Sequence, residues 1–156
     1  MPRFRKSAWI DAPVEVVFAF HEEPDALERL TPPWAPVQVL ERSGGIAPGG
    51  RVSLLIPIGP WRVKWVAEHT SYEKNRLFTD VQIQGPFRFW RHRHEFEPSR
   101  GGALMTDDIE FGLPGDPAAS LLAGWAVRLQ LNRMFTYRHE AARRICEARS
   151  RAAAKK

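Results

Sequence analysis

The sequence has 156 residues, of which 44% are hydrophobic, and a formal net charge of +5. This length and composition suit one domain with a sizeable core and exclude a disordered chain. No apolar run is long enough to span a bilayer, and no apolar signal core follows the basic start of the chain. Because one cysteine allows no internal disulfide, we expect a cytoplasmic protein without membrane insertion.

The positive charge is concentrated at the C-terminal end. From Arg138 onward there are seven basic and two acidic residues, which accounts for the whole surplus. Proteins that bind nucleic acid instead spread basic residues over a folded surface. We therefore expect no specific nucleic-acid partner. We also expect a single domain at residues 1–150 and a basic disordered tail at residues 151–156.

The expected elements follow a simple order along the chain. A first strand at Phe4–Ile10 precedes two short helices, one entered through Asp11-Ala12-Pro13 and one at Asp25–Leu30. Further strands are expected at 37–41, 51–58, 62–72, 77–84, 87–97 and 103–111, and a long helix at about 118–150. Strands joined by short turns form an antiparallel sheet. The pattern predicts an α+β fold, with a curved sheet of about seven strands wrapped around the C-terminal helix.

The segment from Gly85 to Pro98 carries the strongest functional signal. With a period of two, Trp90, His92, His94 and Phe96 share one face of a strand. Two imidazoles between aromatic residues indicate the wall of a cavity that is mainly apolar but also holds polar groups or water, because each buried imidazole needs a hydrogen-bond partner. The same pattern fits two core or interface histidines whose neighbours satisfy them.

The following strand offers a carboxylate to these histidines. Met105, Asp107 and Ile109 alternate on its apolar face, and the hairpin at Gly101-Gly102 brings this face against the histidine strand. Asp107 is thus a plausible partner of His92 or His94, for acid–base chemistry or as a structural ion pair. Asp80 is a second possible partner. The sequence does not say whether Asp80 and Gln82 or their neighbours Val81 and Ile83 face inward.

The remaining candidates come from other elements. Arg138 lies on the apolar stripe of the long helix, where it either reaches a ligand carboxylate or an inward acid, or extends to solvent. Trp34 follows two prolines and either packs in the core or gates a pocket. His92, His94 and Asp107 are the candidate catalytic residues. The candidate ligand-binding residues are Trp65, Asp80, Gln82, Trp90, His92, His94, Phe96, Met105, Asp107, Ile109, Leu131, Phe135 and Arg138.

No cofactor is expected. His92, His94 and Asp107 have the composition of a two-histidine, one-carboxylate metal set, but no spaced motif supports it, and we assign no metal ligands. The glycine pairs at 44–45 and 49–50 are turn signals rather than a nucleotide fingerprint. There is no serine or cysteine nucleophile motif.

Several stretches together resemble the START-like (SRPBCC) superfamily of helix-grip proteins, which includes polyketide cyclases. The resemblance covers roughly residues 3–148 and is closest to a bacterial subgroup of small, single-domain, ligand-binding members. Some relatives are fused to nucleotide-sugar epimerase-like domains. The matching stretches are Ile10–Pro13 with Val17-Phe18, Leu30–Trp34, Gly85–Phe96, Met105–Asp107 with Phe111 and Leu113-Pro114, and Phe135–His139.

The superfamily shares a cavity and not a reaction. We expect a small hydrophobic or aromatic ligand bearing polar groups, bound between the sheet and the C-terminal helix by a carrier or sensor. One alternative is a cofactor-independent cyclase or dehydratase, a lyase or isomerase in type, that uses His92 or His94 with Asp107. Another is a regulatory protein-interaction module that uses arginine-rich helix ends and exposed aromatic residues. The sequence leaves the ligand and the oligomeric state open.

Overall fold

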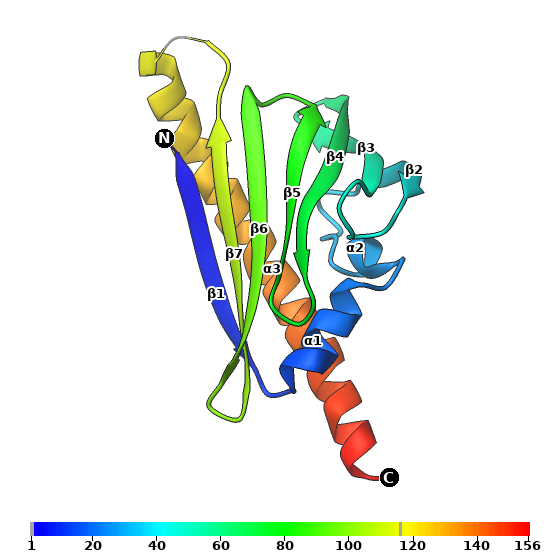
Figure 1. Cartoon of the computed structure of the whole chain (residues 1–156). Helices are drawn as coiled ribbons and strands as arrows, with labels where there is room; N and C mark the ends of the chain where they lie inside the picture. The colour runs from blue at the N-terminus through cyan, green and yellow to red at the C-terminus, as the bar shows by residue number, and fades with distance from the viewer. Residues whose placement is uncertain (1, 116) are drawn as a thin grey trace.

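A computed structural model describes residues 2–115 and 117–156 (Figure 1). Seven strands and three helices are present in this part of the chain. In chain order they are β1 (Arg3–Ile10), α1 (Val14–His21), α2 (Ala26–Arg29), β2 (Gln38–Ser43), β3 (Arg51–Ile58), β4 (Trp61–Glu73), β5 (Leu77–Gln84), β6 (Phe89–Ser99), β7 (Gly102–Gly112) and α3 (Pro117–Ala154).

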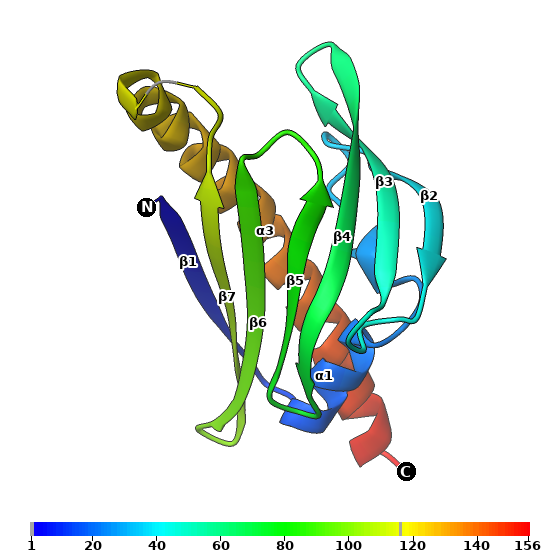
Figure 2. The same cartoon turned by 45° about the horizontal axis from the view of Figure 1, so that its top comes forward.

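The strands form one antiparallel sheet in the order β1-β7-β6-β5-β4-β3-β2. From β2 to β7 each strand pairs with the next one along the chain, while β1 closes the edge beside β7. Figures 1 and 2 show the sheet curving around α3, with α1 beside the C-terminal half of that helix. This confirms the predicted helix-grip architecture, including the two short helices after the first strand.

The hairpin between β6 and β7 sets the register on which the site depends. Arg100 and Gly101 form its two-residue loop, with φ angles of 48° and 79°. Two successive positive φ values are those of a type I′ turn, whose twist matches that of the flanking strands. The turn pairs Ser99 with Gly102, and the pairing continues without a shift to the far end of the hairpin. The inward faces predicted for the two strands therefore meet.

Two apolar clusters form the interior. The first joins α1 to the C-terminal half of α3 and includes Phe18, Phe20, Phe96, Met105 and Cys146. The second lies under the middle of α3 and consists of Phe4, Trp90, Ile109, Phe111, Leu131 and Phe135. Burying these side chains supplies most of the driving force for folding. The polar residues described below lie between the two clusters.

The long helix differs from its prediction at both ends. It continues to Ala154, so residues 151–154 are helical rather than part of a disordered tail. Near its start, Leu121 and Trp125 are 79% and 69% exposed, and Leu129 is exposed as well, although all three share the helical spacing of the apolar residues further along the helix. Figures 1 and 2 show the reason: the first turns of α3 extend past the end of β7, where the sheet offers nothing to pack against. In the described part of the chain, no helix combines the length and the apolarity that crossing a membrane requires.

Candidate functional site

Three neighbouring strands bring two histidines and two aspartates together on the concave face of the sheet. Asp107 on β7 lies directly opposite His94 on β6, and Asp80 on β5 lies directly opposite His92. Each aspartate is also the diagonal neighbour of the other histidine, within reach of a side chain. The structure thus answers the question of which face of β5 points inward: Asp80 does.

Asp107 accepts hydrogen bonds from three imidazoles. Its Oδ1 lies 2.7 Å from His92 Nε2 and 3.0 Å from His94 Nδ1, and its Oδ2 lies 2.6 Å from His139 Nε2. The carboxylate is almost fully buried, as are His92 and His139. All three contacts are favourable only if each nitrogen carries a proton and the carboxylate is ionised. Burial alone would raise the pKa of Asp107, but the bonds from His139, His92 and His94 hold it well below its usual range.

His94 lies between two carboxylates. Besides Asp107 at its Nδ1, it donates through Nε2 to Asp80 Oδ2 at 3.0 Å. Burial would lower the pKa of His94, but the hydrogen bonds and the charges of Asp107 and Asp80 outweigh burial and raise this pKa to about 9. His94 is therefore an imidazolium at neutral pH, and it holds the pKa of Asp80 below its usual value against the opposing effect of burial.

The neighbouring histidine has the opposite charge preference. The rings of His92 and His94 lie 3.7 Å apart between centroids. Burial, followed by the positive charge on His94, lowers the pKa of His92. At neutral pH the pair therefore holds one imidazolium and one neutral imidazole whose Nε2 carries the proton given to Asp107. Two adjacent groups with separated pKa values are an arrangement that acid–base sites use.

His139 was missed as a site residue from the sequence. It lies on α3 four residues after Phe135, so the helical spacing of the apolar stripe contained the signal. His21 and His69 were missed as well. Burial lowers the pKa of both, to about 4 for His21. All five histidines of the chain are therefore buried or half-buried.

Arg138 adds a positive charge to this interior. Its guanidinium lies 5.2 Å from the ring centre of Phe135 and is attracted by Asp107 and Asp80. Burial lowers its pKa, yet a guanidinium remains charged in any protein. The buried Arg138 Nε has no hydrogen-bond partner among the described residues, and neither do Nδ1 of His69 and Nδ1 of His139. Unsatisfied buried polar atoms are costly, so these three are candidate positions for the binding of a further group.

The other predicted residues divide between the two apolar clusters. Trp90, Ile109, Leu131 and Phe135, with Trp65 at the margin, form the cluster beside the polar residues. Phe96 and Met105 instead pack in the cluster under α1, at 3% and 2% exposure. We leave these two out of the site.

Gln82 faces inward like Asp80, but both ends of its amide are engaged. Its Nε2 donates to the carbonyl oxygen of Phe87 at 2.8 Å, and its Oε1 accepts from the backbone N–H of the same residue at 3.2 Å. These bonds close the turn between β5 and β6, which gives Gln82 a structural role.

Access to the polar residues is asymmetric. The side chains of His94 and Asp80 are 15% and 14% exposed, against 6% for His92 and 7% for Asp107. Solvent therefore reaches the site from the side of β5, at Asp80 and His94. The α3 helix covers the other side, where His92 and His139 lie. A separate groove of about 530 Å³ lies on the outer side of α3, between Trp34 and the helix residues Leu129, Arg133 and Tyr137. Trp34 is held there by Tyr137 and by the guanidinium of Arg133, 4.6 Å from its ring centre.

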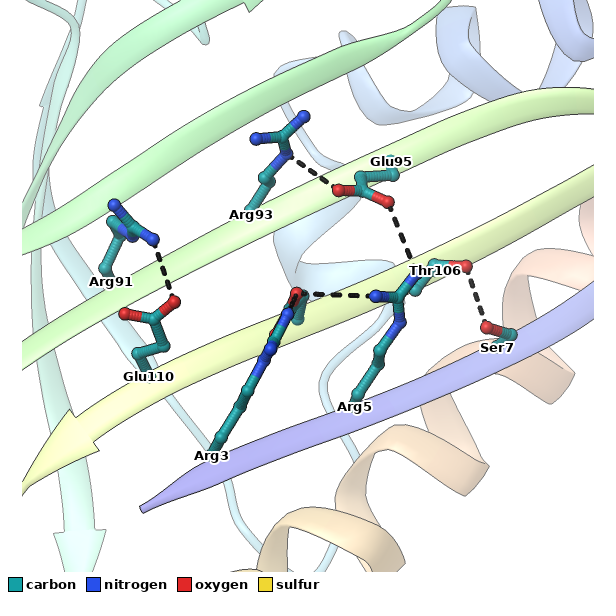
Figure 3. A network of polar contacts seen from close by, with 9 residues as sticks. Arg3, Arg5, Ser7, Arg91, Arg93, Glu95, Thr106 and Glu110 are labelled. Carbon is teal, nitrogen blue, oxygen red and sulfur yellow. Dashed lines mark hydrogen bonds and ion pairs between the residues drawn. The ribbon is translucent and has the colours of Figure 1, made fainter. Parts of the chain in front are cut away.

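The convex face of the sheet carries a different polar network, shown in Figure 3. Arginines on β1 and β6 pair there with acids on β6 and β7: Arg91 with Glu110 at 2.8 Å and Arg93 with Glu95 at 2.8 Å. Arg3 donates through Nε to Asp108 at 2.7 Å. Exposed ion pairs of this kind contribute little stability. Because its acids are already paired, this face is a hydrated surface and not a candidate site.

Comparison with known families agrees with this architecture. The model of the family described as polyketide cyclase / dehydrase and lipid transport matches residues 10–136. The chain belongs to this family. The match includes β6 and β7 and reaches along α3 to just before Arg138 and His139. A search of curated proteins gives no significant match.

Solved structures with the same fold cover most of the chain. The protein TTHA0849 from Thermus thermophilus is 16% identical, with a TM-score of 0.69 over 90% of this chain and 97% of that one. The di-domain aromatase/cyclase StfQ of the steffimycin biosynthetic pathway is 14% identical, with a TM-score of 0.75 over 95% of this chain and 51% of StfQ. A nucleoside-diphosphate sugar epimerase from Corynebacterium glutamicum is 30% identical, with a TM-score of 0.60 over 88% of this chain and only 28% of the epimerase.

Proposed function

We propose that this member of the polyketide cyclase / dehydrase family binds a small, mostly apolar ligand that carries an oxygen or carboxylate group. One observation carries the proposal: charged groups stand between two apolar clusters, and the buried Arg138 Nε lacks a partner among the described residues. A binding site for a purely apolar ligand has no use for such groups, since burying them is costly. Pockets that combine apolar walls with a few polar groups are typical of small-molecule sites.

In this proposal the ligand enters from the side of β5, where Asp80 and His94 are partly exposed. Its rings contact Trp65 and Trp90, which lie at 5.0 Å between centroids in an edge-to-face arrangement. Its oxygen accepts a hydrogen bond from Arg138 Nε–H, the buried donor that has no partner among the described residues. This donor is charged, and bonds to charged donors are the stronger kind. The site would therefore prefer anionic or strongly polarised oxygen over a neutral hydrocarbon end.

Two naphthalene probes of nearly equal shape test this preference. Tryptophan fluorescence should show 2-naphthoic acid binding at least about tenfold more tightly than 2-methylnaphthalene, the value expected for one charge-assisted hydrogen bond. Arg138→Met should abolish the preference, because it keeps an unbranched apolar stem and removes the donors. Arg133→Met on the exposed side of α3 is the matched control and should preserve it. Equal affinities for the two probes in the wild type, or a preference retained in Arg138→Met, would contradict the proposal. Native mass spectrometry of the purified protein would reveal a co-purifying ligand directly.

Catalysis is a second candidate function, favoured by the separated pKa values of His92 and His94. In an aldol dehydration, neutral His92 would remove a proton from carbon while protonated His94 would donate one to the departing hydroxyl, which leaves as water. No cofactor takes part. This chemistry fits the cyclase and dehydratase members of the family, whereas a carrier needs neither proton transfer.

A pH–rate profile separates the two functions. With a poly-β-keto thioester as substrate, an enzyme should lose activity as pH rises through about 9, because His94 then gives up the proton of the general acid. His94→Gln should lose most of the activity and its alkaline limb, whereas Arg93→Gln on the opposite face of β6 should retain both. A wild type that binds the thioester without accelerating its cyclisation is a carrier.

A further inference from the structure

We infer that Asp80, His92 and His94 form a binding site for one divalent transition-metal ion of the Zn²⁺ type. One ligand atom from each of the three residues lies within 4.8 Å of the other two. The inference does not rest on the proposed ligand, because the ion can be tested in the absence of any organic molecule.

The distances suit a single ion. Asp80 Oδ2 lies 3.0 Å from His94 Nε2 and 3.9 Å from His92 Nδ1. Two ligands of a tetrahedral Zn²⁺ lie roughly 3.3 Å apart, given Zn–N and Zn–O bonds of about 2.0–2.1 Å. The two observed distances bracket this value. An ion at this point would take the place of the proton that His94 now shares with Asp80.

The outer shell is already in place. Asp107 accepts from the other nitrogen of each proposed ligand, His92 Nε2 at 2.7 Å and His94 Nδ1 at 3.0 Å. Metal-binding histidines usually donate a hydrogen bond from their second ring nitrogen to a carboxylate. This bond fixes the tautomer and directs the first nitrogen toward the ion. For this reason the carboxylate ligand is Asp80 and not Asp107, whose two oxygens are occupied by the three histidines.

A fourth group stands beside the set. His69 on β4 is directly opposite Asp80, and its buried Nδ1 has no hydrogen-bond partner among the described residues. Because His94 and Asp80 are partly exposed, water also reaches this point. Two nitrogens, one carboxylate oxygen and a fourth position for His69 or water make a tetrahedral site for Zn²⁺ or Co²⁺. The nearby charge of Arg138 opposes a cation, so we expect moderate rather than very tight binding.

Titration of the chelator-treated, tag-free protein with Zn²⁺ and Co²⁺ tests the inference. We expect one ion per chain by calorimetry, a higher melting temperature with Zn²⁺, and the intense visible absorption of four-coordinate Co²⁺. Asp80→Asn and His92→Gln should each weaken binding at least about tenfold. Asp108→Asn, a carboxylate on the outer face of β7, and Cys146→Ala, which removes the only thiol, should leave binding unchanged.

The inference is overturned if Co²⁺ keeps the pale spectrum of its six-coordinate aqua ion, or if binding persists in both Asp80→Asn and His92→Gln. If these variants fail to fold, the wild-type spectrum and stoichiometry decide alone. If the wild type binds 2-naphthoic acid but no ion, the metal site is ruled out and the proposed function stands. If it binds the ion but shows no preference for 2-naphthoic acid, the metal site stands and the proposed function is ruled out.

Discussion

Replacing Asp107 with alanine is expected to lower the free energy of unfolding by about 3–5 kcal/mol, the usual loss when one partner of a buried charged pair is removed. The variant would leave His94 with one carboxylate instead of two and would deprive His92 and His139 of their acceptor. The loss should exceed that of a single buried hydrogen bond, which is about 1–3 kcal/mol for each unsatisfied group. Urea unfolding followed by tryptophan fluorescence measures it.

Glu110→Ala is the matched control for Asp107→Ala. Glu110 lies on the same strand but faces outward, and its partner Arg91 is 56% exposed. This variant should lose no more than about 1 kcal/mol. The pKa of His94, followed by NMR of its imidazole, should also fall below about 9 in Asp107→Ala, provided that the variant folds. Equal small losses in the two variants would show that the histidines do not depend on this carboxylate.

The second large effect is a loss of stability in alkaline solution. The folded-state pKa of His94 is about 9, above the ordinary value of 6.5. Its stabilising contribution is therefore complete below about pH 6.5 and disappears as pH rises through about 9. The full contribution is on the order of 3 kcal/mol, since each pKa unit corresponds to about 1.4 kcal/mol. Metal-free protein in a chelator should accordingly unfold at clearly lower urea concentration at pH 10 than at pH 7.

Cys146 must be removed from this experiment. Burial raises its pKa to about 12, so the unfolded chain ionises first and stability falls with rising pH for this reason as well. In a Cys146→Ala background, the alkaline loss should be clearly larger with His94 than in His94→Gln, where the raised pKa of Tyr72 still causes some loss. An alkaline loss of the same size in both proteins would assign it to other groups.

Acid should destabilise the protein through different histidines. Burial lowers the pKa values of His21, His69 and His92. Below about pH 6.5 these histidines are therefore protonated in the unfolded chain but still neutral in the folded chain, and stability falls. Stability should therefore have its maximum near neutral pH. Buried and half-buried histidines thus limit the stability of the fold at both alkaline and acid pH.

Local patterns in the sequence determined the inner faces of β6 and β7. The period of two placed His92, His94 and Asp107 on one side of their strands. The two-residue turn at Arg100-Gly101 then fixed their register. Both are properties of neighbouring residues, so the contact of the His92–His94 pair with Asp107 could be predicted without a tertiary structure.

Other features were decided only by how distant elements pack. Asp80 faces inward because β5 pairs with β6 in a register that sets Asp80 opposite His92, and no pattern within β5 reveals that register. Phe96 and Met105 have the periodicity of the site, yet they pack under α1 because the site ends where that helix begins to cover the sheet. The exposed Leu121 and Trp125 have the spacing of a buried face, but the helix there extends past the sheet.

His139 shows the same limit most clearly. The spacing on α3 placed it near Phe135, but only the packing of α3 against the sheet brings its Nε2 to 2.6 Å from Asp107 Oδ2. Sequence periodicity determines which face of an element is apolar, because it depends on a few consecutive residues. The position of that face over the sheet depends on the packing of the whole core. This packing is the reason that Asp107 accepts hydrogen bonds from three histidines.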